Sequence, residues 1–523
     1  MFCRLHSATV LGIAASIIEI EVDLKKGLPF QSIVGLPDTA VKEARERVGA
    51  AIRNSGFAFP LGSLTINLAP ADLRKVGSIF DLAIAVGVLL ASKQIQNNRE
   101  TESFIFVGEL SLDGTLRPVK GVLSIAEKAR NEGIKRMVLP VQNYHEASLV
   151  TGLTLHAVSC LCKAVDALCA GSDTTLPVKI TTSLKNGKSH EKCNTDFSDV
   201  RGQNYATRAA SVAAAGGHNM LFIGSPGSGK TMIANRIPGI LPPMSENESL
   251  ETTKIYSAAG LLSEQEGLIG RRPFRMPHHT ASDVSIVGGG RNPLPGEITL
   301  AHNGVLFMDE FPEFKNNIIQ ALRQPLENGY ISITRADCRF VYPARFMLVA
   351  AMNPCPCGYL FDPEYECRCS RQHISRYFMK ISGPILDRIG IQVVVKPLKP
   401  YDIIEGKPAE TTESIRHRVM TARALQNERF SASAINNNAS MNAEQIKRHC
   451  SLNRNARNIL YDAAKKFRLT ARSYHKILQV ARTVADLDER ADVSDEDILE
   501  ALSYREVERI LYGEKMDTRK MYS

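Results

Sequence analysis

Residues 220–231 read as a short apolar run, Met220-Leu221-Phe222-Ile223, followed by Gly224-Ser225-Pro226-Gly227-Ser228-Gly229-Lys230-Thr231. A helical pattern comes next, so the order is strand, glycine-rich loop, helix. Glycines let the backbone curl until successive N–H groups point at one phosphate, and the helix N-terminus adds partial positive charge. Lys230 is expected to reach the outer phosphates of a nucleotide, and the Thr231 hydroxyl to hold Mg²⁺. The alternative is a glycine-rich turn without a ligand, which the spacing and the context disfavour.

Two further apolar runs end in polar side chains. Val305–Met308 is followed by two carboxylates, Asp309 and Glu310. As a buried parallel strand, this run would carry both acids to the sheet edge where the phosphate loop lies. Asp309 is suited to hold Mg²⁺ through water, and Glu310 to orient and deprotonate the attacking water. The run Phe346–Met352 ends at Asn353, whose amide is expected to hydrogen-bond the γ-phosphate or the water. Together the runs predict ATP hydrolysis.

Composition limits the class of protein. The chain has 523 residues, of which 44% are hydrophobic, so it can bury several cores and form two to four domains. Its longest apolar stretch, Leu82–Ala91, is well below the ~20 residues of a membrane span, and Ile18–Leu24 alternates as a half-buried strand does. We therefore expect a cytoplasmic protein with no membrane partner and 11 reduced cysteines. The net charge of +9 is compatible with a polyanionic partner but demonstrates none.

The chain divides into four parts by composition and periodicity. Residues 1–165 combine short strands with helical patterns, and residues 166–196 are polar and turn-rich, as an interdomain linker is. In residues 197–398 strands alternate with helices, which predicts an α/β fold with an open parallel sheet. Residues 399–523 are predicted to form a helical lid domain, whose clearest helix begins near Thr470.

These motifs resemble the AAA+ superfamily, in the branch that contains magnesium chelatase and the minichromosome-maintenance helicases, and especially the ComM-type magnesium-chelatase-like proteins. The segments that carry the resemblance are Asp199–Gln203, Ala213–Asn219, Arg275–Thr280, Pro295–Glu297, Leu300–His302 and Asn353–Gly358. They run through most of the predicted parallel sheet, and a looser similarity extends over the entire chain. The resemblance implies a homohexameric, ATP-driven DNA translocase or helicase that migrates DNA branches during natural transformation and recombination.

The resemblance also implies roles for two arginines. Arg388, at the end of Gly383–Arg388, matches an arginine finger that would complete the ATP site of a neighbouring subunit and stabilise charge on the γ-phosphate. Arg472, in the first turn of the helix near Thr470, matches the sensor arginine of the lid domain. The alternatives are a salt-bridged helix arginine for the first and an N-terminal surface arginine for the second.

An insertion and a hairpin are expected in the ATPase core. About 80 residues separate the phosphate-loop lysine from the acidic strand, more than one βαβ crossover requires. Residues 267–299 resemble the loop that this AAA+ branch inserts into its second helix. The runs Tyr330–Thr334 and Cys338–Tyr342 predict a hairpin. In the resembled proteins this hairpin projects into a central pore, which would bring Arg335 to a DNA phosphate backbone; a solvated hairpin tip is the alternative.

Four cysteines form two C-x-C pairs: Cys355, Cys357, Cys367 and Cys369. Four thiols this close together suit a tetrahedral Zn²⁺ site, although paired knuckles more often have C-x-x-C spacing. Free thiols and a redox-sensitive pair are the alternatives. His278 and His279 also invite a metal interpretation, but no third ligand is evident and neighbouring side chains on a strand point apart. We expect loop packing or substrate contact there.

Residues 1–165 resemble the proteolytic domain of Lon, notably at Gly108–Gly114 and Pro118–Gly121. Lon-type proteolysis needs a serine that is activated by a lysine. Here Ser78 is out of register and Leu123 occupies the position expected for the lysine. The domain is therefore predicted to be non-catalytic and to stabilise the ring or add DNA-binding surface.

Two other functions stay open on the sequence alone. A magnesium-inserting chelatase subunit is the first, because the ATPase cores are so alike. A ring chaperone that remodels proteins is the second. Stimulation of hydrolysis by DNA would separate the translocase from both.

Overall fold

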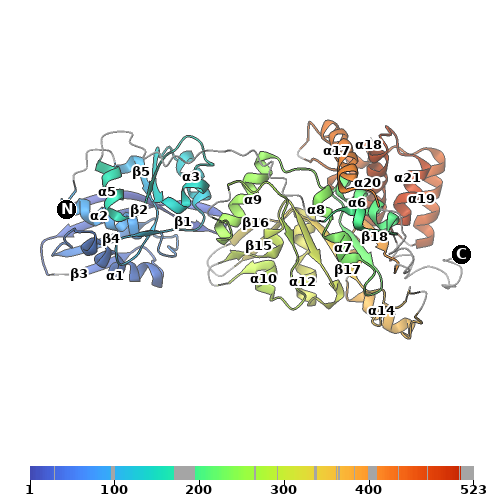
Figure 1. The fold of residues 1–523 in the computed structure, drawn as a ribbon, viewed down its shortest axis with the longest axis horizontal. Helices are drawn as coiled ribbons and strands as arrows, with labels where there is room; N and C mark the ends of the chain where they lie inside the picture. The colour runs from blue at the N-terminus through green and yellow to red at the C-terminus, as the bar shows by residue number, and fades with distance from the viewer. Residues whose placement is uncertain are drawn as a thin grey trace. The chain divides into compact units, whose positions relative to one another are not determined.

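The computed structural model describes residues 1–507 except 29, 96–100, 170–194, 264–266, 291–292, 335–338, 361, 363–364, 382, 398–408, 434, 468 and 506. The chain forms two compact units (Figure 1). Unit 1 consists of Met1–Lys188, Glu246–Ile269 and Arg291–Pro295, and unit 2 of Ser189–Ser245, Gly270–Gly290 and Gly296–Ser523. Among the described residues, no helix combines the length and the apolar character that crossing a membrane requires.

Unit 1 is built on a mixed seven-stranded sheet with the order β3-β4-β2-β1-β5-β8-β9. Its longest strands, β1 (Phe2–Leu11) and β2 (Ala14–Lys25), pair antiparallel. Ile18, Ile20 and Val22 of β2 are buried, as the alternation of apolar and acidic residues predicts. The other strands are β3 (Phe30–Val34), β4 (Ser63–Ala69), β5 (Phe104–Phe106), β8 (Arg136–Pro140) and β9 (Thr154–Val158), with a small separate pair of β6 (Glu109–Leu110) and β7 (Leu116–Arg117).

Helices cover this sheet: α1 (Thr39–Asn54), α2 (Asp81–Ala91), α3 (Val122–Asn131), α4 (Tyr144–Ala147) and α5 (Leu161–Cys169). Every residue of α2 is buried. The longest apolar stretch of the chain is therefore a core helix of unit 1. The last helix, α5, continues past residue 165 to Cys169.

A helix from the middle of the sequence, α9 (Glu246–Ala259), belongs to unit 1. Lys254 Nζ lies 2.5 Å from Glu127 Oε2 of α3. The Ser257 hydroxyl donates to the buried carboxylate of Glu146, which also accepts from the Leu123 N–H at 2.8 Å. Burial raises the pKa of Glu146, and these hydrogen bonds oppose the shift. The part of the insertion that joins unit 1 thus begins earlier in the chain than the expected 267–299.

Unit 2 contains a five-stranded sheet with the order β11-β14-β17-β10-β18. The strands are β11 (Phe274–Arg275), β14 (Val305–Met308), β17 (Met347–Met352), β10 (Met220–Ile223) and β18 (Ile391–Val394). All four neighbouring pairs are parallel. Every residue of β10, β14 and β17 is buried, as expected for parallel strands that are covered on both faces. The predicted α/β class is confirmed.

Short helices of unit 2 connect and flank this sheet. They are α6 (Asn204–Gly216), α7 (Lys230–Ala234), α8 (Ile237–Ile240), α10 (Asp283–Val287), α11 (Glu297–Leu300), α12 (Asn316–Ala321), α13 (Arg323–Asn328), α14 (Arg371–Met379) and α15 (Gly383–Leu386). The predicted hairpin is confirmed: β15 (Tyr330–Thr334) pairs antiparallel with β16 (Arg339–Pro343) immediately before β17. Arg335 lies outside the described residues, so its DNA-binding role stays a prediction.

The C-terminal part of unit 2 is helical, with α17 (Thr412–Arg429), α18 (Ala443–His449), α19 (Arg454–Phe467), α20 (Ala471–Leu487) and α21 (Asp495–Ser503) gathered together (Figure 1). Thr470 is the N-cap of α20, and its side chain accepts from the Ser473 N–H. His218, just after α6, bonds Thr483 of α20 at 2.8 Å. This buried contact joins the helical part to the sheet-bearing core.

Candidate active site

Three neighbouring parallel strands end at one edge of the unit 2 sheet. Ile223 at the end of β10 is aligned with Met352 at the end of β17, and Met308 at the end of β14 is aligned with Ala350. Because the strands run in the same direction, the residues after them meet at the carboxyl edge, where open α/β sheets bind ligands. The phosphate loop, the two acids and Asn353 are those residues.

The phosphate loop holds Lys230 in a fixed position. Its Nζ donates to the carbonyl oxygens of Gly224 at 2.8 Å and Ser225 at 2.9 Å, and lies 3.5 Å from Asn353 Oδ1. Burial lowers the pKa of Lys230, and the charge of Asp309 opposes this shift. Gly227 and Gly229 adopt φ angles of 78° and 94°, which side chains disfavour. The curled loop that the glycines predict is therefore present.

Two hydroxyls of this loop fit a polyanionic ligand. The Oγ atoms of Ser225 and Ser228 are buried and have no hydrogen-bond partner among the described residues. A buried hydroxyl without a partner is costly, and a phosphate oxygen would accept from it. The loop also leads into the N-terminus of α7, which favours negative charge.

The residues predicted to hold Mg²⁺ lie together. Thr231 Oγ1 donates to Asp309 Oδ2 at 2.8 Å, and the Glu310 backbone N–H donates to Asp309 Oδ1 at 2.9 Å. A hydroxyl and a carboxylate form the hard oxygen donor set that Mg²⁺ takes alongside water and substrate phosphates. The donor set therefore fits Mg²⁺.

Glu310 is held in an unusual backbone conformation. Its φ is 50°, in the left-handed region that non-glycine residues rarely adopt and that recurs at active sites. Its Oε2 lies 3.0 Å from His279 Nδ1, and the His279 ring meets Phe314 edge-on. The imidazole thus fixes the direction of the carboxylate that is expected to act on water.

The two histidines lie in the loop after β11, in agreement with the expected loop packing. The rings of His278 and His279 are 4.3 Å apart, so the two side chains do not point apart as neighbours on a strand would. His278 bonds Thr280, whereas His279 bonds Glu310. The described residues gather no metal-ligand group around them.

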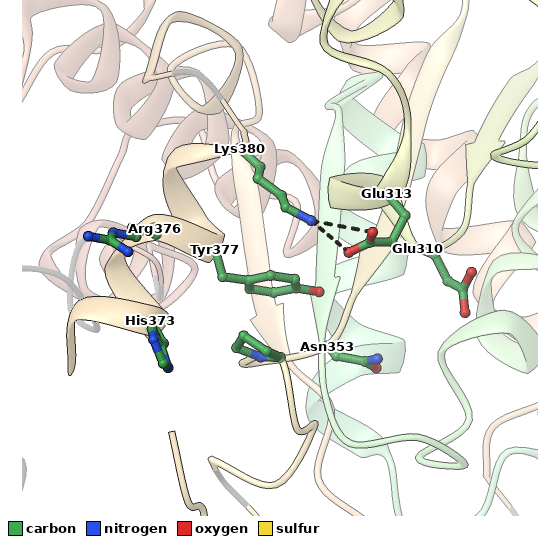
Figure 2. A pocket seen from close by; sticks show the side chains of 8 residues that line it. Glu310, Glu313, Asn353, His373, Arg376, Tyr377 and Lys380 are labelled. Atoms are coloured by element: carbon green, nitrogen blue, oxygen red, sulfur yellow. Dashed lines mark hydrogen bonds and ion pairs between the residues drawn. The ribbon is translucent and has the colours of Figure 1, made fainter. Parts of the chain in front are cut away.

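Asn353 lines a cavity of about 410 Å³. The lining residues are Glu310, Glu313, Asn353, Pro356, His373, Arg376, Tyr377 and Lys380. Figure 2 shows Asn353 and Glu310 on one side of the cavity, with His373 and Arg376 of α14 on the other. Lys380 Nζ bonds Glu313 Oε1 at 3.0 Å. The cavity therefore gives room for a reacting group beside the proposed base.

The four predicted cysteine ligands converge. Their Sγ atoms all lie within 4.8 Å of one another. The Sγ of Cys355 is 3.3 Å from that of Cys357, and both are 3.6 Å from that of Cys367. Tetrahedral zinc with Zn–S bonds of ~2.3 Å needs sulfur atoms ~3.8 Å apart. The four thiols fit Zn²⁺ with small adjustments.

The cysteine loop also contacts the phosphate loop. Gly358 has a φ of 87°, and a Cβ placed on it would lie 2.8 Å from Pro226 Cδ. Cys355 follows Asn353 by two residues. The cysteine loop is thus connected to the nucleotide edge through Asn353 and through the Gly358–Pro226 contact.

The two predicted arginines share one carboxylate, which the sequence did not reveal. Arg388 Nη2 and Arg472 Nη2 bond the two oxygens of Glu327 on α13, the second at 2.5 Å. The pair with Arg388, and after it Arg472, holds the pKa of Glu327 below its ordinary value. Arg388 is almost buried, and its Nη1 donates to Pro384 O.

Known families match most of the chain. The family described as magnesium chelatase, subunit ChlI, matches residues 196–403; further ChlI families match residues 20–143 and, for the ChlI C-terminal part, 409–505. Competence protein ComM of Haemophilus influenzae is 42% identical over 511 residues, which is 97% of this chain and 98% of its own length. The chain belongs to the ComM-type family of magnesium-chelatase-like proteins.

Two further relatives extend the comparison. YifB of Escherichia coli is 42% identical over 508 residues, which is 97% of each chain. The magnesium-chelatase subunit ChlI of Euglena gracilis is 22% identical over 201 residues, or 34% of this chain and 51% of its own. The similarity to ComM and YifB thus extends over far more of the chain than the similarity to this chelatase subunit.

In this ComM-type chain the serine considered for peptidase chemistry and the nearby lysine each have a different hydrogen-bond partner. The Ser78 hydroxyl bonds Glu109, and the buried Lys75 Nζ donates to the Pro70 carbonyl. Nearby, Asp81 pairs with Arg47 at 2.9 Å; burial raises the pKa of Asp81 to about 6 despite that pair. Neither of the first two contacts joins the Ser78 hydroxyl to a lysine, which Lon-type activation of a serine requires.

Proposed function

We propose that the chain is an ATP-driven DNA translocase or helicase that works as a homohexameric ring. The observation that carries this proposal is the convergence of Lys230, Thr231, Asp309 and Glu310 at one sheet edge. Nucleotide binding needs the first three, and the carboxylate of Glu310 adds a group that can take a proton from water.

The chemistry is divided among these residues. Lys230, the loop N–H groups and the serine hydroxyls bind the phosphates, and Thr231 and Asp309 hold Mg²⁺, which neutralises charge on the phosphate oxygens when bound. Asn353 hydrogen-bonds the γ-phosphate or the attacking water. His279 orients the Glu310 carboxylate, which accepts the proton. Zn²⁺ held by the four cysteines would fix the loop beside Asn353 without taking part in the chemistry.

Assembly completes the site in this proposal. Arg388 acts as an arginine finger on the ATP of a neighbouring copy, and Arg472 senses the same nucleotide. A guanidinium at the γ-phosphate is worth several powers of ten in rate, so hydrolysis depends on the ring. A hexamer is the assembly of the class that the chain resembles.

DNA is the proposed substrate of the motor. Arg335 follows the described strand β15 in the sequence, and an arginine on a pore hairpin would contact phosphates without regard to sequence. The relative from Haemophilus influenzae is named for competence. We infer that this chain migrates DNA branches during natural transformation and recombination.

The family match supports one alternative, and a second stays open from the sequence. A chelatase subunit is favoured by the ChlI description of the matching families, and a protein-remodelling ring shares the same ATPase core. The test measures ATP turnover without DNA, with single-stranded DNA and with forked DNA. We expect both DNAs to raise turnover and Glu310→Gln to abolish it. The matched control Glu444→Gln removes an exposed carboxylate that pairs with Arg448 and should behave as wild type. Turnover that neither DNA changes would refute the translocase.

A further inference from the structure

Glu327 contacts two arginines of the ATPase core and lies just before the hairpin in the sequence. Its two oxygens bond Arg388 and Arg472, which come from a loop after α15 and from the first turn of α20. Its own helix, α13, ends at Asn328, directly before the hairpin strand β15. One carboxylate therefore connects both proposed phosphate-contacting arginines to the segment that leads into the hairpin.

Two further basic residues add to the positive charge that Arg388 and Arg472 place around Glu327. Lys476 and Arg505 lie near them, and burial together with the charges of Arg472, Arg505 and Arg388 lowers the pKa of Lys476 to about 8. Such a cluster attracts an anion. The carboxylate of Glu327, whose side chain is 47% exposed, is the anion that occupies it here.

Arg388 is fixed at its backbone and confined at its side chain. Asn219 Nδ2 donates to the Arg388 carbonyl at 3.2 Å, and Arg505 donates to the Ile389 carbonyl at 2.8 Å. The side chain is 9% exposed and bonds Glu327. To meet a phosphate on another copy, the guanidinium has to leave Glu327 while its backbone stays in place.

The helix that carries Glu327 is hydrogen-bonded to the hairpin. The Ser332 N–H of β15 donates to Gln324 Oε1 of α13 at 3.2 Å. Gly329 N donates to Pro325 O at 2.9 Å, and Ala344 N donates to Gly329 O at 2.8 Å. A displacement of α13 therefore carries β15 and the strand paired with it.

We propose that Glu327 is a positioning residue that holds Arg388 and Arg472 until a γ-phosphate on a neighbouring copy takes them, and that its release moves α13 and the β15–β16 hairpin. The proposal rests on the proposed function. A carboxylate and a phosphate compete for the same guanidinium hydrogens, because both accept planar, charge-assisted pairs. Binding of the neighbour's ATP is then coupled to the hairpin by exchange of one anion for another.

The first test measures ATP turnover of the full-length chain without DNA. Glu327→Gln keeps the size of the side chain but removes its charge, so the arginines are free before the phosphate arrives. Two partly exposed ion pairs predict a rise in the DNA-free kcat of about threefold to tenfold, with a smaller further stimulation by DNA. The same change at Glu444 is the matched control. A DNA-free rate at or below wild type would overturn the proposal.

Two further variants separate a holding role from a structural one. Glu327→Asp keeps the charge on a shorter side chain and should give a DNA-free rate between those of wild type and Glu327→Gln; a rate equal to that of wild type would count against the proposal even where the glutamine variant fails to fold. In an Arg388→Ala background, Glu327→Gln should no longer raise the rate, because the arginine that it releases is missing. A rise that persists there would also overturn it.

The outcomes distinguish this inference from the function on which it rests. Loss of turnover in Glu310→Gln together with an unchanged rate in Glu327→Gln would refute only the role of Glu327. Full turnover in Glu310→Gln would refute the role of Glu310 as the base, and wild-type turnover that neither DNA changes would refute the proposed translocase.

Discussion

Replacing Cys357 by alanine removes one of the four thiols that converge beside the nucleotide edge. The sulfur atoms of Cys355, Cys357 and Cys367 are 3.3–3.6 Å apart, close to the ~3.8 Å of a tetrahedral zinc site. Structural zinc contributes an apparent ~10–16 kcal/mol with four ligands, so the loss of one ligand costs about 3–4 kcal/mol, or roughly 10²–10³-fold in metal affinity. We expect Cys357→Ala to be purified without stoichiometric zinc.

The loss should reach the ATP site through two contacts. Asn353 precedes the first cysteine by two residues, and Gly358 lies against Pro226 of the phosphate loop. A loosened loop moves the Asn353 amide away from the γ-phosphate, and a displaced donor of this kind costs up to ~10²–10³ in kcat. Because the β17 strand still anchors Asn353, we expect a fall of about tenfold.

The assay measures zinc per chain by elemental analysis and ATP turnover on the same sample. Cys160→Ala is the matched control, since Cys160 is a half-buried cysteine of unit 1 outside the cluster. It should keep both the zinc and the turnover of wild type. Wild-type protein that binds less than 0.1 zinc per chain, roughly, after expression in zinc-supplemented medium would refute the reasoning, as would a Cys357→Ala variant that keeps its metal.

Three other changes test separate parts of the site. His279→Ala should lower kcat only about fivefold, because its 3.0 Å pair with Glu310 is partly exposed; a loss as large as that of Glu310→Gln would mean that His279 has a chemical role of its own. Mixing Arg388→Ala with Lys230→Ala protein should restore part of the turnover that each lacks, because mixed interfaces join an intact ATP site to an intact arginine; no recovery would contradict action between copies. Lys476→Met should raise the free energy of unfolding by about 1–3 kcal/mol at pH 7. The pKa of Lys476 in the folded chain is about 8, so the unfolded chain binds more protons than the folded chain between pH 8 and about 10.5. The free energy of unfolding of the wild type therefore rises over that window. Denaturant titrations should show the advantage of the variant disappearing there.

The sequence was sufficient for the core of the nucleotide site because its signal is local. Buried parallel strands are continuous apolar runs, and the reactive residues stand immediately after them, as at Asp309 and Asn353. Helix α20 was equally readable, since Thr470 caps it and its apolar residues recur with helical spacing. Local chemistry thus predicted both the sheet and the polar residues at its edge.

Long-range contacts could not be read in the same way. Nothing near Glu327 in the sequence indicates that it bonds Arg388 and Arg472, which lie 61 and 145 positions away. The pairing of His279 with Glu310 depends on the neighbouring positions of β11 and β14 in the sheet. Helix α9 joins unit 1 through Glu146 and Glu127, although it follows the phosphate loop in the chain. Each of these contacts is set by tertiary packing, which no local pattern records.

The fate of ATP bound to the Glu310→Gln variant tests the nucleotide site most directly. Labelled ATP and Mg²⁺ are mixed with excess protein, and the nucleotide that stays bound is identified after one wild-type turnover time. The convergence of Lys230, Thr231, Asp309 and Glu310 predicts that the variant retains ATP with near wild-type affinity and forms no ADP, whereas the wild-type chain forms ADP. A variant that produces ADP at the wild-type rate, or a wild-type chain that binds no ATP, would contradict the nucleotide site described here.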